Sequence, residues 1–245
     1  MQHDLTESIN FPRTDEAFAK KTGIGTLLLF PGIALVLPLF LVLGYYFRVL
    51  KDGLESKTQL PEWDQFGRLF IQGLTCFAVL LVYMLPGSLL GAVALIPGMA
   101  MRGGSIFEPQ NILSTFLKMG AGVLCLVGQA LIPMALARFA HTGKLASAFQ
   151  IKEIIEQIKA SVSTYGKLVI ALCVSSVVIG YVGRFLTAVP FYLGTFFTMA
   201  LAFYTALVFM HWTGAIYRDR CLPAPAAAPA VGPLPAVLPA PDELE

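Results

Sequence analysis

The sequence predicts an all-α, polytopic integral membrane protein, and its composition and charge distribution carry this prediction. Of the 245 residues, 56% are hydrophobic and 13% are charged, against about 25% charged residues in a soluble domain. Long uncharged apolar runs separate most of the Lys and Arg residues into four short groups. No stretch alternates as a porin strand does, and a backbone in lipid must satisfy its own hydrogen bonds, so helices are the expected spanning elements.

The positive residues also predict the orientation of the chain. All but three of the seventeen Lys and Arg residues belong to the four groups. These residues are Arg13, Lys20 and Lys21, then Arg48, Lys51, Lys57 and Arg68, then Arg138, Lys144, Lys152, Lys159 and Lys167, and finally Arg218 and Arg220. Cytoplasmic segments of membrane proteins collect Lys and Arg. We therefore expect all four groups, the N-terminal segment 1–21 and the C-terminus on the cytoplasmic side.

The first apolar run, about 22–47, is expected to be broken. A plain span would place the first two basic groups on opposite sides of the membrane and remove the charge bias. Pro31-Gly32 and Pro38 lie near the middle of the run, where proline removes a helical donor and clashes with the preceding turn. We expect a re-entrant hairpin whose arms reach about half the bilayer and return. The alternative is a kinked single helix, which gives five spans and an external N-terminus.

Four further segments are long and apolar enough to cross the membrane, at about 68–101, 112–139, 165–184 and 187–217. The first of them contains Pro86-Gly87 and Pro97-Gly98, so we expect a span that ends near Leu90 and a separate apolar piece after it. Together with the first run, these segments form one helical membrane domain of about residues 22–220.

Two segments outside the spans have patterns of their own. In residues 145–163, apolar side chains recur at helical spacing opposite a polar face, namely Ile151, Ile154, Ile155, Ile158 and Val162. This pattern predicts a cytoplasmic amphipathic helix that lies on the membrane surface or, alternatively, packs on a partner. The tail 221–245 is rich in Pro and Ala, which favours an extended, disordered chain. Docking of this tail to a partner is the alternative.

Polar groups that could carry chemistry within the membrane are few. Gln129 lies well inside the segment 112–139 and is the best candidate for an intramembrane polar site. His141 and His211 are candidate ligands for a metal or for the magnesium of a pigment, because neutral imidazole is a common ligand. A histidine that hydrogen-bonds a carbonyl is the simpler interpretation of each.

The sequence gives no reason to expect an enzyme. It contains no H-E-x-x-H, G-x-S-x-G or Walker motif and no clustered carboxylates. We therefore expect no catalytic residues, no metal and no cofactor. The net charge of +2 is too small to indicate a nucleic-acid partner.

Several short motifs resemble those of the family known as DUF4013. The segment Leu60-Pro61-Glu62-Trp63-Asp64-Gln65-Phe66-Gly67 is similar to the family's L-P-E-W-D-D-F-G, with Gln65 where an acid is common. Gly44-Tyr45, an A-x-A-R-[YF] segment at 135–140 and a closing pattern of aromatic, small residue, His, Gly and Tyr-Arg at 204–218 also resemble family motifs. The likeness covers about residues 20–218. It implies a polytopic membrane protein, mainly of bacteria and archaea, whose biochemical role is uncharacterised, and hence a plasma (inner) membrane location.

The segment around Trp63 is the first candidate for a contact surface. Pro61 suits the first turn of a helix, Glu62 and Asp64 suit its positive N-terminus, and Trp63 suits the membrane interface. Alternatively, Glu62 and Asp64 bind a cation or a partner's basic patch. The candidate partner or lipid contacts are Glu62, Trp63, Asp64, Phe66, Lys152 and Lys159.

These features predict a non-enzymatic membrane accessory or scaffold protein. It would bind lipid, another membrane protein or a second copy of itself through small-residue faces, the amphipathic helix and the tail. The alternative is a small oligomeric transporter or channel for a weakly polar or lipid-like substrate, because broken helices often mark transport sites. The shortage of buried charge argues against ion-coupled transport.

Overall fold

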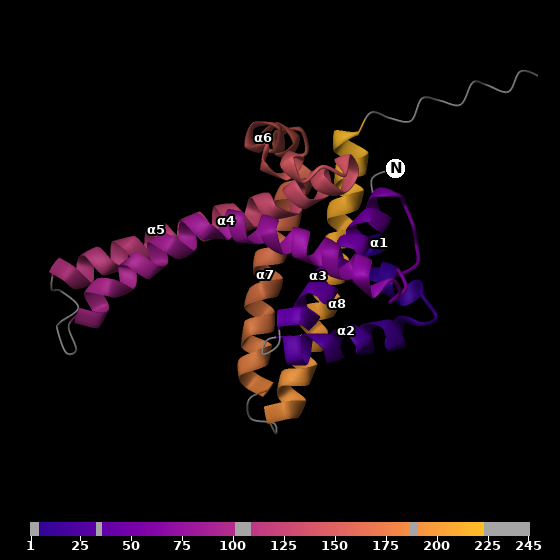
Figure 1. The fold of residues 1–245 in the computed structure, drawn as a ribbon, viewed down its shortest axis with the longest axis horizontal. Helices are drawn as coiled ribbons and strands as arrows, with labels where there is room; N and C mark the ends of the chain where they lie inside the picture. Colours follow the sequence, from indigo (N-terminus) through magenta and orange to yellow (C-terminus); the bar gives the residue numbers. More distant parts are fainter. Residues whose placement is uncertain (1–4, 33–35, 101–108, 187–190, 223–245) are drawn as a thin grey trace, which may run out of the picture.

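The computed structural model describes residues 5–32, 36–100, 109–186 and 191–222, and every regular element in these ranges is helical. In chain order the elements are α1 (Leu5–Asn10), the 3₁₀ helix η1 (Phe11–Thr14), α2 (Phe18–Gly32), α3 (Val36–Leu54), α4 (Phe66–Ala100), α5 (Pro109–Thr142), the 3₁₀ helix η2 (Leu145–Phe149), α6 (Ile151–Ala160), α7 (Val162–Leu186) and α8 (Phe191–Cys221). Figure 1 shows two long hairpins, α4–α5 and α7–α8, that diverge from a common junction. The predicted all-α class is confirmed.

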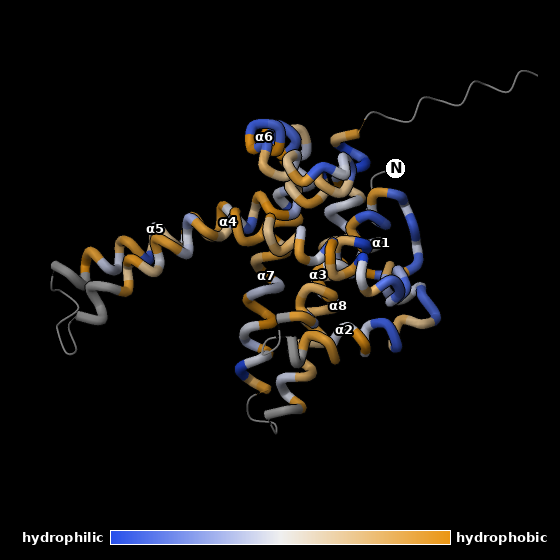
Figure 2. The backbone as a smooth tube through the Cα atoms, in the orientation of Figure 1, coloured by the Kyte–Doolittle hydropathy of each residue, from blue (hydrophilic) through white to orange (hydrophobic). Residues whose placement is uncertain are grey.

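In the described part of the chain, four helices are long and apolar enough to cross a membrane, and they match the four predicted spans. Their apolar parts are Phe66–Leu95, Ile112–Thr142, Val162–Leu186 and Leu193–Cys221. Figure 2 shows apolar residues along both hairpins and polar residues at α6 and along the connection from α3 to α4. We call the end of the molecule that carries this connection, α6 and the C-terminal turns of α8 the polar end. The chain is a multi-pass membrane protein.

The first apolar run forms two helices, which confirms the predicted break. Pro31-Gly32 are the last residues of α2, and Pro38 falls in the first turn of α3, where a proline interrupts no helical hydrogen bond. The residues between the two helices, 33–35, lie outside the described part of the chain. α2 packs across α8 at a position where Gly25 leaves room for the ring of Phe203. A re-entrant path through the membrane stays a prediction.

α4 is one continuous helix, so the prediction of an end near Leu90 is wrong. Gly87 lies directly against α5, because a Cβ atom at this position would come within 2.9 Å of the backbone nitrogen of Cys125. On α5, a Cβ on Gly128 would lie 2.6 Å from the carbonyl oxygen of Tyr83. A neighbouring helix at this distance supports the turn that Pro86 weakens, as is common for proline within membrane helices.

The predicted helix at 145–163 is shorter in the structure. Gln150 interrupts it with φ −80° and ψ 73°, and its side-chain oxygen accepts a 2.7 Å hydrogen bond from Arg138. In α6, Ile154 is fully buried, whereas Ile151 and Ile155 are exposed. The predicted disordered tail begins after α8, and its residues 223–245 lie outside the described ranges.

α3 lies at the centre of the junction because its backbone meets two other helices at glycines. A Cβ on Gly44 would lie 2.0 Å from the carbonyl oxygen of Leu69 in α4, and a Cβ on Gly53 would lie 2.3 Å from that of His211 in α8. The partners are also glycine-bearing: Gly73 of α4 faces the carbonyl of Phe40, and Gly214 of α8 faces that of Leu50.

The side chains of α3 therefore enter two separate groups of buried residues. Phe47 and Leu50 pack with residues of α4, α5, α7 and α8, and the ring of Phe47 lies 4.9 Å from that of Phe139. Val42, Tyr45 and Val49 pack with α8 and with Leu60 of the connection to α4. One helix thus links the N-terminal segments to both hairpins.

The close approach of α3 to α4 gives the first testable prediction. Gly44→Ala should destabilise the protein by about 1–3 kcal/mol, as overpacking does, because the added methyl group would collide with a backbone carbonyl that no rotamer change can move. The apparent melting temperature in detergent should fall accordingly.

Gly122→Ala is the matched control, because among the described residues no atom beyond the adjoining backbone of α5 lies within 4 Å of a Cβ at that position. Its melting temperature should be unchanged or slightly higher, since alanine favours helix over glycine. Equal melting temperatures for the two variants would contradict the central packing of α3.

Candidate site at the polar end

The connection between α3 and α4 folds back over α3 and is fixed there by two aromatic rings. The ring of Trp63 stacks on that of Tyr45, with centroids 4.1 Å apart and planes 3° apart. The Tyr45 hydroxyl donates a 3.0 Å hydrogen bond to the carbonyl of Pro61, and the Trp63 indole N–H donates one of 3.0 Å to the carbonyl of Lys21. The Trp63 ring is thus half-buried against the protein, and its role as a membrane anchor stays a prediction.

The start of α4 also differs from the prediction. The helix begins at Phe66, so Pro61 lies in the connection and not in the first turn. Gln65 adopts a positive φ of 51°, and its carbonyl accepts hydrogen bonds from the backbone N–H groups of Arg68 and Leu69. Gln65 therefore turns the chain into the helix.

Lys21 ties the connection to the N-terminal segment. Its ammonium group donates to the Asp15 carboxylate at 2.9 Å and to the carbonyl of Leu60 at 2.9 Å, and it lies 2.7 Å from the Glu62 carboxylate. The Lys21 and Asp15 side chains are 6% and 8% exposed, whereas that of Glu62 is 73% exposed. A cation with so little exposure needs these partners, because an unpaired buried charge is costly.

Asp15 is held in its ionised form. Burial alone would raise the pKa of this carboxyl group, but the hydrogen bond and charge of Lys21, with N–H donors from Ala17 and Leu60, outweigh burial and lower the pKa below its usual value. Burial likewise opposes the charge of Lys21, yet Glu62 and Asp15 raise its pKa. Each partner therefore stabilises the charge of the other.

Arg48 holds the other acid of the motif. Its guanidinium forms an ion pair with Asp64 and donates a 3.2 Å hydrogen bond to the carbonyl of Glu62. Glu62 and Asp64 thus bind cations of this chain, Lys21 and Arg48. The alternative in which they bind an external cation or a partner's basic patch would have to displace these two ion pairs.

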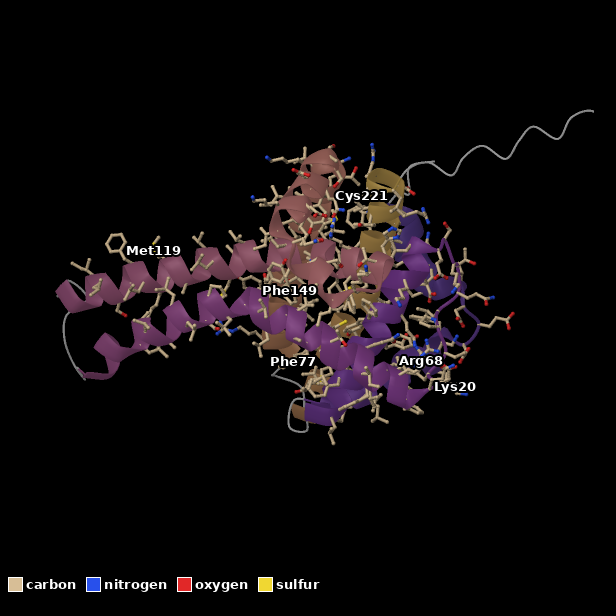
Figure 3. The ribbon with its side chains drawn as sticks, turned by 45° about the horizontal axis from the view of Figure 1, so that its top comes forward. Lys20, Arg68, Phe77, Met119, Phe149 and Cys221 are labelled. Atoms are coloured by element: carbon tan, nitrogen blue, oxygen red, sulfur yellow. The ribbon has the colours of Figure 1, made fainter. Side chains whose placement is uncertain are left out.

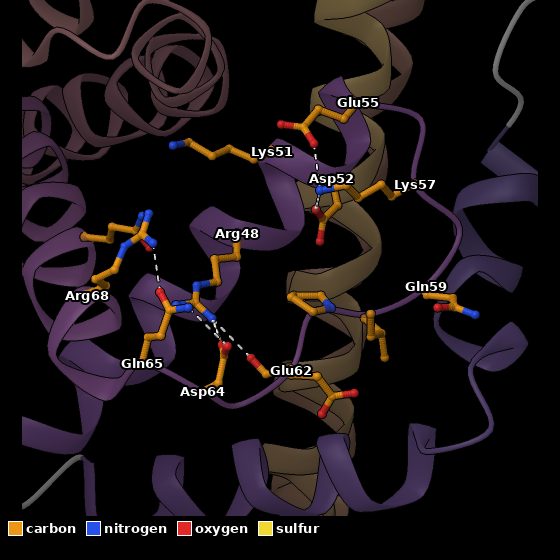
Figure 4. Close-up of a pocket in the computed structure, with 13 residues that line it drawn as sticks. Arg48, Lys51, Asp52, Glu55, Lys57, Gln59, Glu62, Asp64, Gln65 and Arg68 are labelled. Carbon is orange, nitrogen blue, oxygen red and sulfur yellow. Dashed lines mark hydrogen bonds and ion pairs between the residues drawn. The ribbon is translucent and has the colours of Figure 1, made fainter.

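These contacts leave an open polar cavity of about 590 Å³ between α3, the connection and the first turns of α4 (Figure 4). Its charged walls come from four cations and four acids. The lining residues are Arg48, Lys51, Asp52, Glu55, Lys57, Gln59, Leu60, Pro61, Glu62, Asp64, Gln65, Arg68 and Gln72. Lys57 pairs with Asp52 at 3.3 Å and with Glu55 at 2.7 Å. Burial raises the pKa of the Asp52 carboxyl group despite this partner.

His211 has an internal role beside this cavity. It is 2% exposed, and its ring stacks on that of Phe11 with centroids 3.8 Å apart. Its Nδ1 and Nε2 lie 3.4 Å from the Ser8 hydroxyl and from the carbonyl of Lys57. His141 is exposed, and its ring lies 5.8 Å from that of Tyr217. Within the described residues, no three His, Cys, Asp or Glu side chains are grouped as a metal site would need.

The other predicted contact residues are spread over the surface. Phe66 is 53% exposed at the start of α4, close in sequence to the cavity residues. Lys152 and Lys159 are exposed on α6, and Gln129 is exposed on α5. The structure therefore brings together Glu62, Trp63 and Asp64, but not Gln129 or the two lysines of α6.

Among the residues that fix the connection, Asp15, Lys21, Tyr45 and Arg48 were not predicted as site residues, and neither were the cavity cations Lys51, Lys57 and Arg68. Tyr45 had a signal, since Gly44-Tyr45 is one of the motifs that resemble the family pattern. The sequence pattern indicates Lys21 and Arg48 only as charges that orient the chain. Their specific acid partners are distant in sequence or lie in an irregular segment, where spacing gives no guide.

The fold and the site define a multi-pass helical membrane protein with a charged, folded connection at one end. A family model described as a protein of unknown function (DUF4013) matches residues 27–192, which is more than half of the chain. The chain therefore belongs to the DUF4013 family, and the resemblance is confirmed. The closing pattern at 204–218 lies beyond the matched residues. No curated protein and no solved structure matches the chain.

The ion pair of Lys21 gives the second testable prediction. Lys21→Met should destabilise the protein by about 1.5–3 kcal/mol, the usual range for hydrogen bonds to charged groups, because the Asp15 carboxylate would stay buried without its cation. Thermal unfolding in detergent should show this as a lower melting temperature.

Lys20→Met removes the same charge from an exposed neighbouring position and should change stability by less than about 0.5 kcal/mol. In the double variant Asp15→Asn/Lys21→Met, part of the loss should be recovered. Equal effects of Lys20→Met and Lys21→Met would refute the structural role of this pair.

Proposed function

We propose that this protein is a non-enzymatic accessory or scaffold protein of the membrane, which binds lipid or another membrane protein at its polar end. The observation that supports this most is how the charged motif is used. Its acids form ion pairs with Lys21 and Arg48 that fix the connection on α3. The acids of the motif are therefore engaged in holding the structure of the chain itself. The same contacts shape an open polar surface, which suits binding.

α6 is a second part of the proposed binding surface. Its exposed Ile151 and Ile155 stand beside exposed Lys152 and Lys159, a combination typical of helices that lie among lipid headgroups. The buried Ile154 attaches α6 to the rest of the protein. We propose that α6 is an amphipathic helix at the membrane surface.

The polar end is proposed to face the cytoplasm, with both termini on that side. Arg48, Lys57, Arg68, Arg138 and Arg218 all engage groups at this end, and basic segments favour the cytoplasmic side. The transporter alternative draws support only from the division of the first apolar run into α2 and α3. Because Gln129 is exposed on α5, it would line a path only between copies of the chain.

Purification from native membranes tests the accessory role. In a mild detergent, a tagged chain should carry one membrane protein in near-equal amount, or a defined lipid, as measured by quantitative mass spectrometry. Phe66→Ala should lower the yield of a protein partner, because this exposed ring borders the polar end. Phe185→Ala is the control, an 80% exposed ring at the opposite end of α7. A chain that purifies alone, without protein or enriched lipid, would contradict the proposed function.

Orientation is tested by cysteine labelling in intact cells. A cysteine at the exposed position of Glu16, in a variant without other cysteines, should react with a membrane-impermeant maleimide only after the cells are permeabilised. A cysteine at Phe185, at the far end of α7, should react in intact cells. Labelling of both positions in intact cells would place the N-terminus outside and support five spans.

A further inference from the structure

Two cations in the wall of the polar cavity have no acid partner among the residues that the structure describes. Of the four lining cations, Arg48 pairs with Asp64, and Lys57 pairs with Asp52 and Glu55. Within the described ranges, no carboxylate lies in ion-pair distance of Lys51 or Arg68. The Lys51 ammonium lies 5.1 Å from the centre of the Phe47 ring. The Arg68 guanidinium donates a 2.8 Å hydrogen bond to the side-chain oxygen of Gln65. Both cations therefore retain donors for a ligand.

The acids of the cavity do not oppose an anion at this place. Each lining carboxylate is already engaged: Asp64 by Arg48, Glu62 by Lys21, and Asp52 and Glu55 by Lys57. Figure 4 shows Lys51 and Arg68 on the same side of the cavity, while Asp52 and Glu55 lie with Lys57 elsewhere on its wall. Since the lining holds equal numbers of cations and acids, a ligand must be recognised by local contacts and not by a long-range field.

Gln72 adds an amide to the same wall. It lies one turn after Arg68 on α4 and lines the cavity. Its side-chain oxygen is buried and has no hydrogen-bond partner, so the amide is not committed to any other described group. A buried polar atom without a partner is uncommon in a folded protein and calls for an explanation.

The cavity opens where the apolar surface of α4 begins. Arg68 follows Phe66, the first residue of the apolar span, and the next turns expose Ile71 by 65% and Leu74 by 48%. Figure 3 shows Arg68 at the junction end of α4 and Met119 near the far end of the same hairpin. A ligand with its anion beside Arg68 could therefore lay an apolar chain along α4.

We propose that Lys51 and Arg68 bind the phosphodiester group of a membrane glycerophospholipid, while the side-chain oxygen of Gln72 accepts a hydrogen bond from a hydroxyl group of the lipid headgroup. Lysine and arginine donate charge-assisted hydrogen bonds to phosphate oxygens, and basic pockets beside membrane helices bind lipid headgroups. The acyl chains lie along Ile71 and Leu74. This inference rests on the lipid-binding part of the proposed function and names its ligand and its residues.

Native mass spectrometry of the full chain, released from detergent micelles, tests the site. A short-chain phosphatidylglycerol should give one tightly retained lipid per chain. Lys51→Gln/Arg68→Gln should weaken its binding by about tenfold or more, because two charge-assisted contacts are lost. Lys20→Gln/Lys144→Gln removes two exposed cations outside the cavity and should retain the lipid. Gel filtration and melting temperature establish that both variants are folded, and Arg68→Lys alone should keep part of the affinity.

Two further ligands identify what is bound. A diacylglycerol of the same chain length has no phosphate and should not be retained, whereas glycerol 3-phosphate has no acyl chains and should bind far more weakly than the lipid. The proposal is overturned if the cavity variant keeps the lipid as well as the control, if diacylglycerol binds equally, or if glycerol 3-phosphate binds as tightly. A protein partner that still co-purifies with the cavity variant would leave the accessory role standing without this lipid site.

Discussion

The structure depends on the contact between the backbone of α3 and the backbones of α4 and α8. Side chains normally keep helix axes about 8–10 Å apart, and the glycines at 44, 53, 73 and 214 remove them where carbonyl groups of the partner approach. This contact determines where the next residues of α3 point. Tyr45 follows Gly44 and supports the connection, and Arg48 lies about one turn further on and pairs with it. The geometry of the polar end is therefore a consequence of helix packing beneath it.

The connection between α3 and α4 is irregular, so its stability has to come from side chains. Regular backbone hydrogen bonds are absent there, and buried backbone groups must find other partners. Asp15 accepts from the N–H of Leu60, Lys21 donates to its carbonyl, and Tyr45 donates to that of Pro61. The charges contribute little net stability by themselves, since desolvation offsets their attraction. Their effect is to permit only one position of the connection, and this fixes the cavity beside it.

The sequence predicted the features that depend on a single segment and missed those that depend on contacts between two segments. Apolar length identified the four spans, and Pro31-Gly32 identified the break between α2 and α3. The same proline-glycine signal at Pro86-Gly87 was wrong, because the rule describes an isolated helix and Gly87 lies against α5. Trp63 shows a similar ambiguity. An aromatic residue next to charged residues has the same sequence pattern whether its ring faces a lipid interface or stacks on another ring of the chain, as Trp63 does on Tyr45. Only the fold distinguishes these two surroundings.

The divergence of the two hairpins follows from helix length and from the position of α3. The apolar part of α4 has 30 residues and that of α7 has 25, which correspond to about 45 Å and 37 Å at 1.5 Å per residue. A hydrocarbon core of about 30 Å accommodates such lengths when helices tilt or extend beyond it, and the longer hairpin has to do so more. Because α3 packs against both α4 and α8, it holds the two hairpins together at the polar end, while Figure 1 shows them apart elsewhere. A change in the tilt of α4 would therefore alter the α3–α4 contact. It would also alter the shape of the polar cavity, because α3 and the first turns of α4 form part of its wall.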